Sequence, residues 1–518
     1  MSASFDYLQS ALLLAVPLLY AFAALPANWR MARICTALAL GVAAALLGLL
    51  AWAGPVISHS LRADALSCIV LLLVTFIGWV ITRYSQAYLA GDAGQVRHTR
   101  WLMATLAAVS VVVVTNNLGV LALAWLATSL ALHQLLTFFS HRPAALIAAH
   151  KKFLASRLGD VCLFSGVVLI AMTFNSLKID QIISKAQALT AYPLELKTAA
   201  FLIVISALLK CAQLPVHGWL IQVMEAPTQV SALLHAGIVN LGGFLMIRLS
   251  PLIAEVSAAQ TLLVVVGSLT AALAALVMMT RISVKVMLAW STCAQMGFML
   301  MQCGLGAYDL ALLHLVAHSL YKAYAFLAAG GAVEQARLTA MTAPQTDVSL
   351  STLIVGAAGG LVMVATAGMW WGVAFDKLTA LWVLAGIVSL ATTPLISPLL
   401  SARALRIKGL WPVGMLLAAF GVAFAYFGLH HVFGWFVEMP STNGANAFDL
   451  VWVMLCFTLL FAMQCLIRAR PHGVVASSLY PWFYAGLYLD EWFTRFTFRI
   501  WPARLAAAST PIATGVLK

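Results

Sequence analysis

The chain has 518 residues, of which 63% are hydrophobic and only 9% are charged. A soluble domain has nearer a quarter of charged residues, so this composition excludes a soluble globular protein and indicates a polytopic membrane protein. The net charge of +13 does not indicate nucleic-acid binding, because the basic residues lie in short loops between apolar runs, as the positive-inside rule predicts.

Apolar runs long enough to cross a bilayer follow one another along the chain, and they predict an all-α polytopic membrane protein with about 14–15 transmembrane helices. Basic residues gather in alternate loops, which predicts that the N-terminus lies outside and the C-terminus in the cytoplasm. The candidate spans lie near residues 8–25, 34–54, 65–82, 101–115, 118–139, 153–174, 198–224, 229–249, 260–280, 285–303, 308–330, 350–371, 374–399, 410–430 and 449–467.

Residues 208–248 form the most informative stretch of the sequence. An apolar run carries Lys210 and is interrupted at Pro215, and after Pro227 a second apolar run holds His235. An ionisable side chain at bilayer depth costs roughly 2.5–3.5 kcal/mol and normally faces a polar interior. Proline frees backbone carbonyls, which is tolerated where they line a cavity. The stretch therefore predicts a broken helix and a proton or ion site. The alternative is a kinked helix with a snorkelling lysine, which the distance of Lys210 from either flank disfavours.

Further ionisable residues lie in the second half of the chain. Lys285 begins one predicted helix, and His314, His318 and Lys322 lie one turn apart on the next. Histidines at this spacing can hold zinc, but no third ligand is near, so we interpret the stripe as a proton relay. The eight cysteines lie singly, mostly within apolar runs, which is typical of packing. We predict no metal site and no cofactor.

A second interrupted segment follows, in which Gly372 precedes Lys377. Lys210 and Lys377 thus lie in corresponding broken segments of two halves, a pattern typical of inverted-repeat transporters. We therefore expect five regions. They are N-terminal transmembrane helices (1–99), a first repeat (100–249), a second repeat (250–400), C-terminal transmembrane helices (401–470) and an amphipathic cytoplasmic-side tail (471–518).

The motifs in these segments resemble a known family. Residues 210–236, which begin KCAQLPVHGWL and end SALLHA, are similar to the core of the antiporter-like subunits shared by respiratory complex I and the Mrp sodium/proton antiporters. Residues 156–160, 284–299 and 314–326 resemble further motifs of that family, and the resemblance extends from about residue 62 to 380. It implies two inverted antiporter-like repeats and a proton, or sodium, pathway. By this resemblance the pathway residues are Lys210, His235, Lys285, His314, His318, Lys322 and Lys377. We expect supporting residues in Glu225, Arg157, Asp160 and His133, and helix breaks at Pro215, Pro227 and Gly372.

The departures from the family pattern concern acidic residues. Leu126 stands where the family has a glutamate that modulates the channel lysine, and Leu378 stands where it has an aspartate. Leucine cannot ionise, so the function of that glutamate is either missing here or supplied by another residue. His133 lies two turns further along the same helix face and could substitute for it.

The C-terminal segment 477–505 is aromatic and amphipathic, which by itself predicts an interfacial helix at the membrane surface. It also resembles the ending of the membrane subunit of the DAB inorganic-carbon accumulation complexes. That resemblance implies a large cytoplasmic partner with a zinc site similar to a β-carbonic anhydrase. The candidate docking residues are Asp490, Glu491, Arg495 and Arg499.

We therefore expect an ion-conducting membrane subunit that couples an ion gradient to uptake of CO2 or bicarbonate by that partner, with no catalysis in this chain. One alternative is a proton-pumping or cation/proton antiporter subunit of a complex I-like or Mrp-like assembly, against which Leu126 argues. Another is a scaffold that has lost conduction and anchors a cytoplasmic enzyme. The retained lysines and histidines argue against a scaffold, because buried charges without a function are costly.

Overall fold

The computed structural model describes residues 2–58, 60–331, 349–373, 379–397, 411–437 and 445–501. The predicted pathway residue Lys377 and the end of the predicted tail, residues 502–518, lie outside these ranges. The described chain is almost wholly helical. Its elements are α1 (Ser2–Ala24), α2 (Trp29–Ala53), β1 (Val56–Ile57), β2 (Arg62–Ala63), α3 (Ala65–Tyr88), α4 (Gln95–Val114), α5 (Leu118–Leu136), α6 (Pro143–Phe174), α7 (Ile179–Gln187), α8 (Leu194–Lys210), α9 (Gly218–Gln222), η1 (Val223–Glu225), α10 (Thr228–Ala236), η2 (Ile238–Asn240), α11 (Leu241–Arg248), α12 (Ser250–Ile253), α13 (Ser257–Met278), α14 (Val284–Gly304), α15 (Tyr308–Leu327), η3 (Ala328–Gly331), α17 (Leu350–Trp370), α18 (Ala380–Ile396), α19 (Trp411–Gly434), α20 (Ala447–Ala469), α21 (Val474–Tyr484), η6 (Gly486–Tyr488) and α22 (Leu489–Ile500).

Twelve helices of the described residues are long and apolar enough to cross a membrane, counting α10 to α11 as one span. The shorter apolar helix α18 and the helices α4 and α8 run beside them. The prediction of an all-α polytopic membrane protein is therefore confirmed. Polar caps mark several helix starts, because the first backbone N–H groups of a helix have no partner within it. Asn28, Asp64 and Asn117 accept these hydrogen bonds at the starts of α2, α3 and α5.

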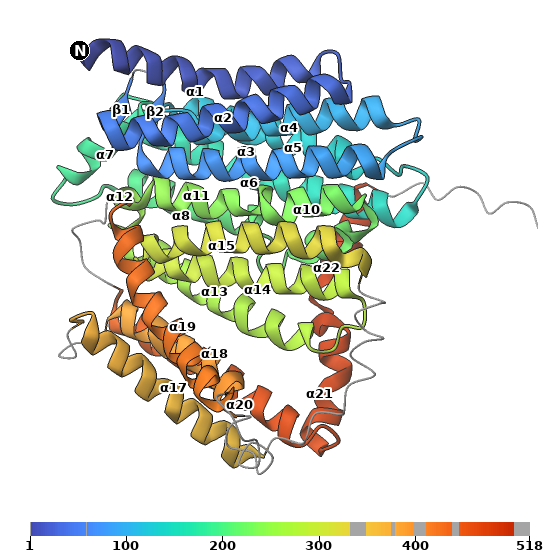
Figure 1. Cartoon of the computed structure of the whole chain (residues 1–518), viewed down its shortest axis with the longest axis vertical. Helices are drawn as coiled ribbons and strands as arrows, with labels where there is room; N and C mark the ends of the chain where they lie inside the picture. Colours follow the sequence, from blue (N-terminus) through green and yellow to red (C-terminus); the bar gives the residue numbers. More distant parts are fainter. Residues whose placement is uncertain are drawn as a thin grey trace, which may run out of the picture.

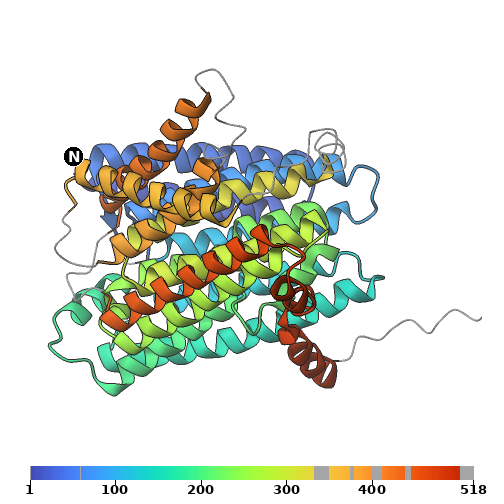
Figure 2. The same cartoon turned by 90° about the horizontal axis from the view of Figure 1, so that it is seen from below.

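The long helices lie side by side in one elongated body, from α1 at one extreme to α17 at the other (Figure 1). The helices α17, α18 and α19 pack on one another and are tilted against the rest. Short elements lie at the two ends of the helices. At the α7 end lie α7 and the antiparallel β1–β2 pair. At the opposite α22 end, α21 and α22 lie across the bundle (Figures 1 and 2). The N-terminus lies at the α7 end, opposite α22.

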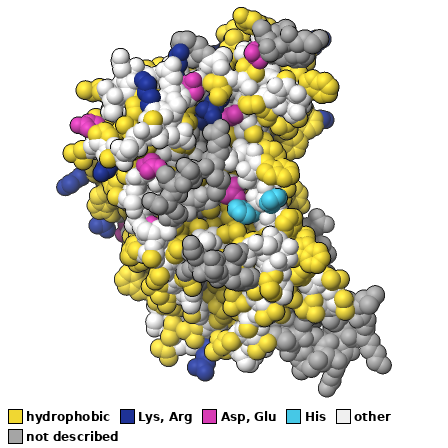
Figure 3. All heavy atoms as spheres, turned by 90° about the vertical axis from the view of Figure 1, so that its left-hand side faces the viewer, with side chains coloured by type: hydrophobic (Ala, Val, Ile, Leu, Met, Phe, Trp, Pro, Cys, Tyr) yellow, Lys and Arg dark blue, Asp and Glu magenta, His cyan; other side chains and the backbone are white. Residues whose placement is uncertain are grey.

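The α7 end faces the viewer in Figure 3. Basic and acidic side chains are scattered over its upper part, whereas hydrophobic side chains cover most of its lower part. Large hydrophobic side chains are also exposed along the helices, for example Leu123, Met172 and Val362. A protein whose long helices expose apolar side chains has its polar surfaces at the helix ends, as a bilayer requires.

Small residues allow the closest helix packing. A Cβ atom at Gly267 on α13 would lie 2.5 Å from the carbonyl oxygen of Gly297 on α14, and a Cβ atom at Gly297 would lie 2.5 Å from the carbonyl oxygen of Gly267. The two backbones therefore touch at these glycines. This is the usual way in which membrane helices associate, because burial of apolar area does not drive packing within lipid.

Candidate functional site

The chain leaves its helical path directly after Lys210. The helix α8 ends at this lysine, Pro215 lies in the connection to α9, and Pro227 immediately precedes α10. The backbone N–H of Leu214 in this connection donates to Thr270 Oγ1 on α13 at 3.2 Å. A non-helical segment at this depth is tolerated because it is buried in protein, where such partners are available.

Lys210 is buried among α5, α6 and α8. Its Nζ lies 4.4 Å from the centre of the Trp125 ring on α5. Among the described residues it has no hydrogen-bond partner. An ammonium over an aromatic face is stabilised by the ring quadrupole, but less than it would be by a carboxylate. The amine is therefore held in place while its hydrogen-bonding capacity stays free.

The face of α6 beside Lys210 carries several charges. Arg157 and Asp160 form an ion pair, with Nη2 2.7 Å from Oδ2. Lys152 is buried and donates to the Ser129 carbonyl and hydroxyl oxygens on α5, at 2.7 and 2.8 Å. It lies near enough to Lys210, Arg157 and Asp160 to interact electrostatically. Sequence reasoning missed Lys152 because it assigned the Lys-Lys pair to a loop, whereas α6 includes both lysines.

His133, a predicted supporting residue, lies at the edge of this group. Its half-buried ring packs against Phe153 and Trp501, with centroid distances of 5.2 and 6.3 Å. The structure gives it no hydrogen bond to Lys210. Its ring neighbours are instead Phe153 of α6 and Trp501, which follows α22.

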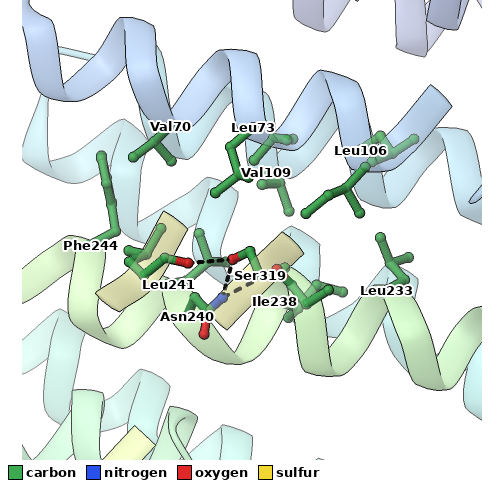
Figure 4. A pocket seen from close by; sticks show the side chains of 15 residues that line it. Val70, Leu73, Leu106, Val109, Leu233, Ile238, Asn240, Leu241, Phe244 and Ser319 are labelled. Atoms are coloured by element: carbon green, nitrogen blue, oxygen red, sulfur yellow. Dashed lines mark hydrogen bonds between the residues drawn. The ribbon is translucent and has the colours of Figure 1, made fainter. Parts of the chain in front are cut away.

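A second helix interruption, which the sequence did not signal, follows His235. The helix α10 ends at Ala236, and after Gly237 a short 3₁₀ helix leads into α11. Asn240 Nδ2 donates to Ser319 Oγ on α15 at 2.6 Å (Figure 4). Beside them lies a cavity of about 20 Å³, otherwise lined mainly by apolar side chains of α3, α4, α10 and α11, and this is room for about one water molecule. The His235 ring is fully buried and has no hydrogen-bond partner among the described residues.

The predicted stripe on α15 lines a single cavity. His314, His318 and Lys322 all border a space of about 560 Å³ between α13, α14 and α15. The two histidine rings lie 6.0 Å apart. Lys322 Nζ donates to Ser291 Oγ and, at 3.3 Å, to the Leu288 carbonyl oxygen. His235 lies close enough to both Lys322 and His318 for their charges to interact, so the structure brings these four residues together.

Lys285 is placed apart from that cavity, at the α22 end. Its Nζ donates to Thr228 Oγ1 in the first turn of α10 at 2.8 Å. Glu225 lies near enough to interact with the Lys285 charge, and its carboxylate is 4.0 Å from Arg142 in an exposed pair. Lys285 and Glu225 thus lie beside Pro227 at one mouth of the broken segment. The remaining predicted break, Gly372, follows α17 with a positive φ of 69°, a conformation that favours glycine.

Two charged groups at the α7 end were missed by sequence reasoning. Arg248 is buried and donates to Asp64, which also accepts from Arg62 Nε at 2.6 Å. Burial alone would raise the pKa of the Asp64 carboxyl. The charge and hydrogen bonds of Arg248, with the charge of Arg62, outweigh burial and hold this pKa well below its usual range. This group borders a cavity of about 690 Å³.

The other missed group is formed by Asp309 and His430. Asp309 is fully buried in the first turn of α15, one and a half turns before His314, and Oδ2 pairs with His430 Nδ1 on α19. An acidic residue in the first turn of a helix is common, because it stabilises the helix N-terminus. The sequence therefore does not indicate that Asp309 is buried. Asp309 and His430 thus form an acid–base pair at the α7 end of α15. Asp309 lies five residues before His314, so it is on a different helix face from the predicted stripe.

The four predicted docking residues lie on α22. Glu491 and Arg495 form an exposed ion pair 3.6 Å apart, and Arg499 is also exposed. Asp490 instead faces the bundle, where its carboxylate lies 2.7 Å from Lys151 Nζ. The structure therefore divides the predicted set between two faces of one helix.

The chain matches two family models. Residues 115–428 match the transmembrane region of NADH:quinone oxidoreductase and the Mrp antiporter, and residues 52–99 match the N-terminus of chain 5 of NADH-ubiquinone oxidoreductase (complex I). It is 39% identical to the probable inorganic carbon transporter subunit DabB of Hydrogenovibrio crunogenus, over 98% of this chain and 97% of that protein. It is also 39% identical to the probable subunit DabB2 of Halothiobacillus neapolitanus, over 87% of this chain and 82% of that one. Among solved structures, a chain of the Mrp complex from Dietzia sp. matches with a TM-score of 0.56 and 25% identity, over 96% of this chain and 57% of that one.

Proposed function

The chain belongs to the antiporter-like membrane-subunit family of NADH:quinone oxidoreductase and the Mrp antiporters, and from this premise we propose that it is the ion-conducting subunit of an inorganic-carbon accumulation system. Protons, or sodium ions, pass through it and drive the uptake of CO2 or bicarbonate by a cytoplasmic partner. The chain itself carries out no hydration chemistry.

The observation that carries the proposal is the presence of buried ionisable side chains on several helices inside the bundle. Lys210 ends α8, His235 lies on α10, and His318 and Lys322 lie on α15. Buried charges are costly within a membrane and are normally found along ion pathways. Two helix interruptions and a cavity that Ser291 and Gln295 help to line lie beside members of this set. Such polar groups are what a moving proton needs.

The relatives support the carbon-uptake reading over the respiratory one. Similarity to DabB of Hydrogenovibrio crunogenus runs along 97% of that protein at 39% identity, whereas similarity to subunit L of the NADH-quinone oxidoreductase of Rhodobacter capsulatus runs along 41% of that protein at 34% identity. The alternative, a pumping or antiporter subunit of a complex I-like or Mrp-like assembly, is favoured by the family model itself. We place the chain in a bacterial inner membrane, with the α7 end outside and the α22 end in the cytoplasm.

The proposed partner is a large cytoplasmic protein with a zinc site similar to a β-carbonic anhydrase. The exposed face of α22, with Glu491, Arg495 and Arg499, is the proposed docking surface. One elementary charge that crosses 100 mV supplies about 2.3 kcal/mol, which is enough to bias a hydration step in one direction. Coupling between the two subunits requires that ion binding within this chain changes the affinity of its docking surface for the partner, and that partner binding in turn changes the affinity for the ion.

Co-purification tests the proposal directly. The tagged chain is purified in mild detergent, and the proteins and zinc that accompany it are identified. We expect one large soluble zinc protein. A set of quinone-linked subunits, or of several small antiporter subunits, would establish the alternative instead.

Lys210→Ala tests the pathway. This variant should lose carbon accumulation down to the level of cells without the protein, because the broken segment then has no group that binds the ion. The complex should still assemble, since Lys210 makes no hydrogen bond to another described residue. Accumulation and co-purification are measured in the same cells. Full accumulation in this variant would overturn the conducting role.

A further inference from the structure

The C-terminal helices fold back onto the bundle. The chain turns after α20, and α21 and α22 lie across the helix ends (Figures 1 and 2). The guanidinium of Arg281, between α13 and α14, donates to the Phe483 carbonyl oxygen at 2.9 Å. Trp501 stacks on His150 of α6, with ring centres 3.9 Å apart and planes within 9° of parallel. The tail, which we define as residues 474–501, is therefore held to the bundle at Phe483 and at Trp501.

Between these two contacts, Asp490 reaches the broken segment. Both of its carboxylate oxygens lie 2.7 Å from Lys151 Nζ, and Oδ2 accepts from Gln222 Nε2 of α9 at 3.1 Å. The Lys151 side chain is 0% exposed, and the Asp490 side chain is 29% exposed. A fully buried lysine needs a counter-charge, and the tail supplies it.

The fit between the tail and the broken segment depends on a glycine. A Cβ atom at Gly218, the first residue of α9, would lie 1.4 Å from Asp490 Oδ1. The carboxylate thus occupies the space that a side chain would take at this position. Any larger residue at position 218 would displace Asp490 from Lys151.

The charges around the first broken segment explain why a carboxylate is needed there. Lys152, Lys210 and Arg157, on α6 and α8, interact electrostatically, and Asp160 is the acidic residue that α6 itself contributes beside them. Lys151, the neighbour of Lys152 in the chain, has its counter-charge in Asp490. Leu126 on α5 contributes no charge. Asp490 brings a second negative charge to this part of α6, where it pairs with Lys151, the residue before Lys152.

We propose that Asp490 is a positioning residue of the ion pathway, a carboxylate that the tail supplies to the mouth of the broken segment. This inference rests on the proposed function. Docked against Lys151, Gln222 and Gly218, Asp490 fixes the geometry of the segment that follows Lys210. The opposite face of the same helix turn exposes Glu491 and the stacked rings of Trp492 and Phe496. A partner that binds this outer face therefore acts on Asp490 through one rigid turn of α22, and the tail connects partner docking to ion passage.

The test is ion flux through the full-length chain reconstituted in proteoliposomes, with an imposed pH gradient and an internal pH-sensitive dye. Liposomes without protein define zero flux, and Lys210→Ala should match them. Asp490→Asn keeps the shape of the side chain and removes its charge, and we expect it to lower flux about tenfold. Asp92→Asn is the matched control, because it removes an exposed acid from the turn before α4 without touching the broken segment. Its flux should equal that of the unmodified chain.

Two further variants separate a pathway role from a purely structural one. Gly218→Ala keeps both charged residues, but the added methyl group pushes the Asp490 carboxylate away from Lys151. This variant should reproduce the loss of flux seen with Asp490→Asn. The charge exchange Lys151→Asp with Asp490→Lys should restore most of the flux lost in Asp490→Asn. If Asp490→Asn lowers the melting temperature markedly, the charge exchange decides, and absence of restored flux then overturns the inference.

The outcomes distinguish this inference from the function on which it rests. If the unmodified chain conducts no better than protein-free liposomes, the conducting role is wrong, and the inference falls with it. If the unmodified chain conducts and Asp490→Asn conducts equally well, only the role of Asp490 is overturned.

Discussion

At the scale of single residues, the buried ionisable groups fall into two kinds. Some have a counter-charge, as Asp64 has in Arg248 and Arg62. Others, such as Lys210 and His235, have no hydrogen-bond partner among the described residues. A paired group holds one protonation state and fixes the structure, whereas an unpaired group keeps the freedom to gain or lose a proton. The two kinds also differ in place, because the Asp64 group lies at the α7 end and the unpaired groups lie inside the bundle.

Asp64→Asn should destabilise the fold. It leaves Arg248 buried without its counter-charge, which costs about 3–5 kcal/mol. The pKa of Asp64 is depressed in the folded protein, so its contribution is present above its unfolded pKa of about 4 and is lost as the pH falls below that value. Thermal unfolding in detergent at several pH values measures both effects. Glu195→Gln, an exposed acid at the start of α8, is the control. Equal melting temperatures for the two variants would contradict the pairing.

At the scale of elements, the site depends on interrupted helices. Proline marks the break after Lys210 in the sequence, because it lacks the N–H that a helix interior needs. The break at Gly237 has no such mark, since it depends on the contact of Asn240 with Ser319, 79 residues away. The burial of Asp309 likewise depends on His430 of a distant helix. Local sequence could therefore predict the spans, the first break and the α15 stripe, but not groups that only tertiary packing brings together.

The contact of α13 with α14 gives a prediction at this scale. Gly267→Ala would place a methyl group 2.5 Å from the Gly297 carbonyl oxygen and should lower the free energy of unfolding by about 1–3 kcal/mol. Gly41→Ala, in α2, is the control, because nothing lies within 4 Å of its added Cβ atom. Thermal unfolding of the two variants in the same detergent makes the comparison. A control as unstable as Gly267→Ala would show that the loss does not arise from helix contact.

At the scale of the whole molecule, the tail joins the proposed docking surface on α22 to the first broken segment. Truncation before Ser477 removes both the docking face and Asp490, so the partner should be released from the membrane. A chain that ends at Trp501 is the control, because it keeps α21 and α22. Membrane fractionation followed by detection of the partner measures the outcome. A partner that stays with the membrane after truncation before Ser477 would limit the tail to lipid contact.

The Lys151–Asp490 contact also sets an order for biogenesis. The two residues are 339 positions apart, so at about 5–20 residues per second the ribosome completes Asp490 roughly 20 to 70 s after Lys151. During this interval α6, α8 and α9 can already be inserted in the membrane, while Lys151 and Gln222 still lack their contact with the Asp490 carboxylate. A polypeptide released early by a stalled ribosome would keep the membrane helices and lack this last contact. Completion of the first broken segment thus depends on translation having passed Asp490.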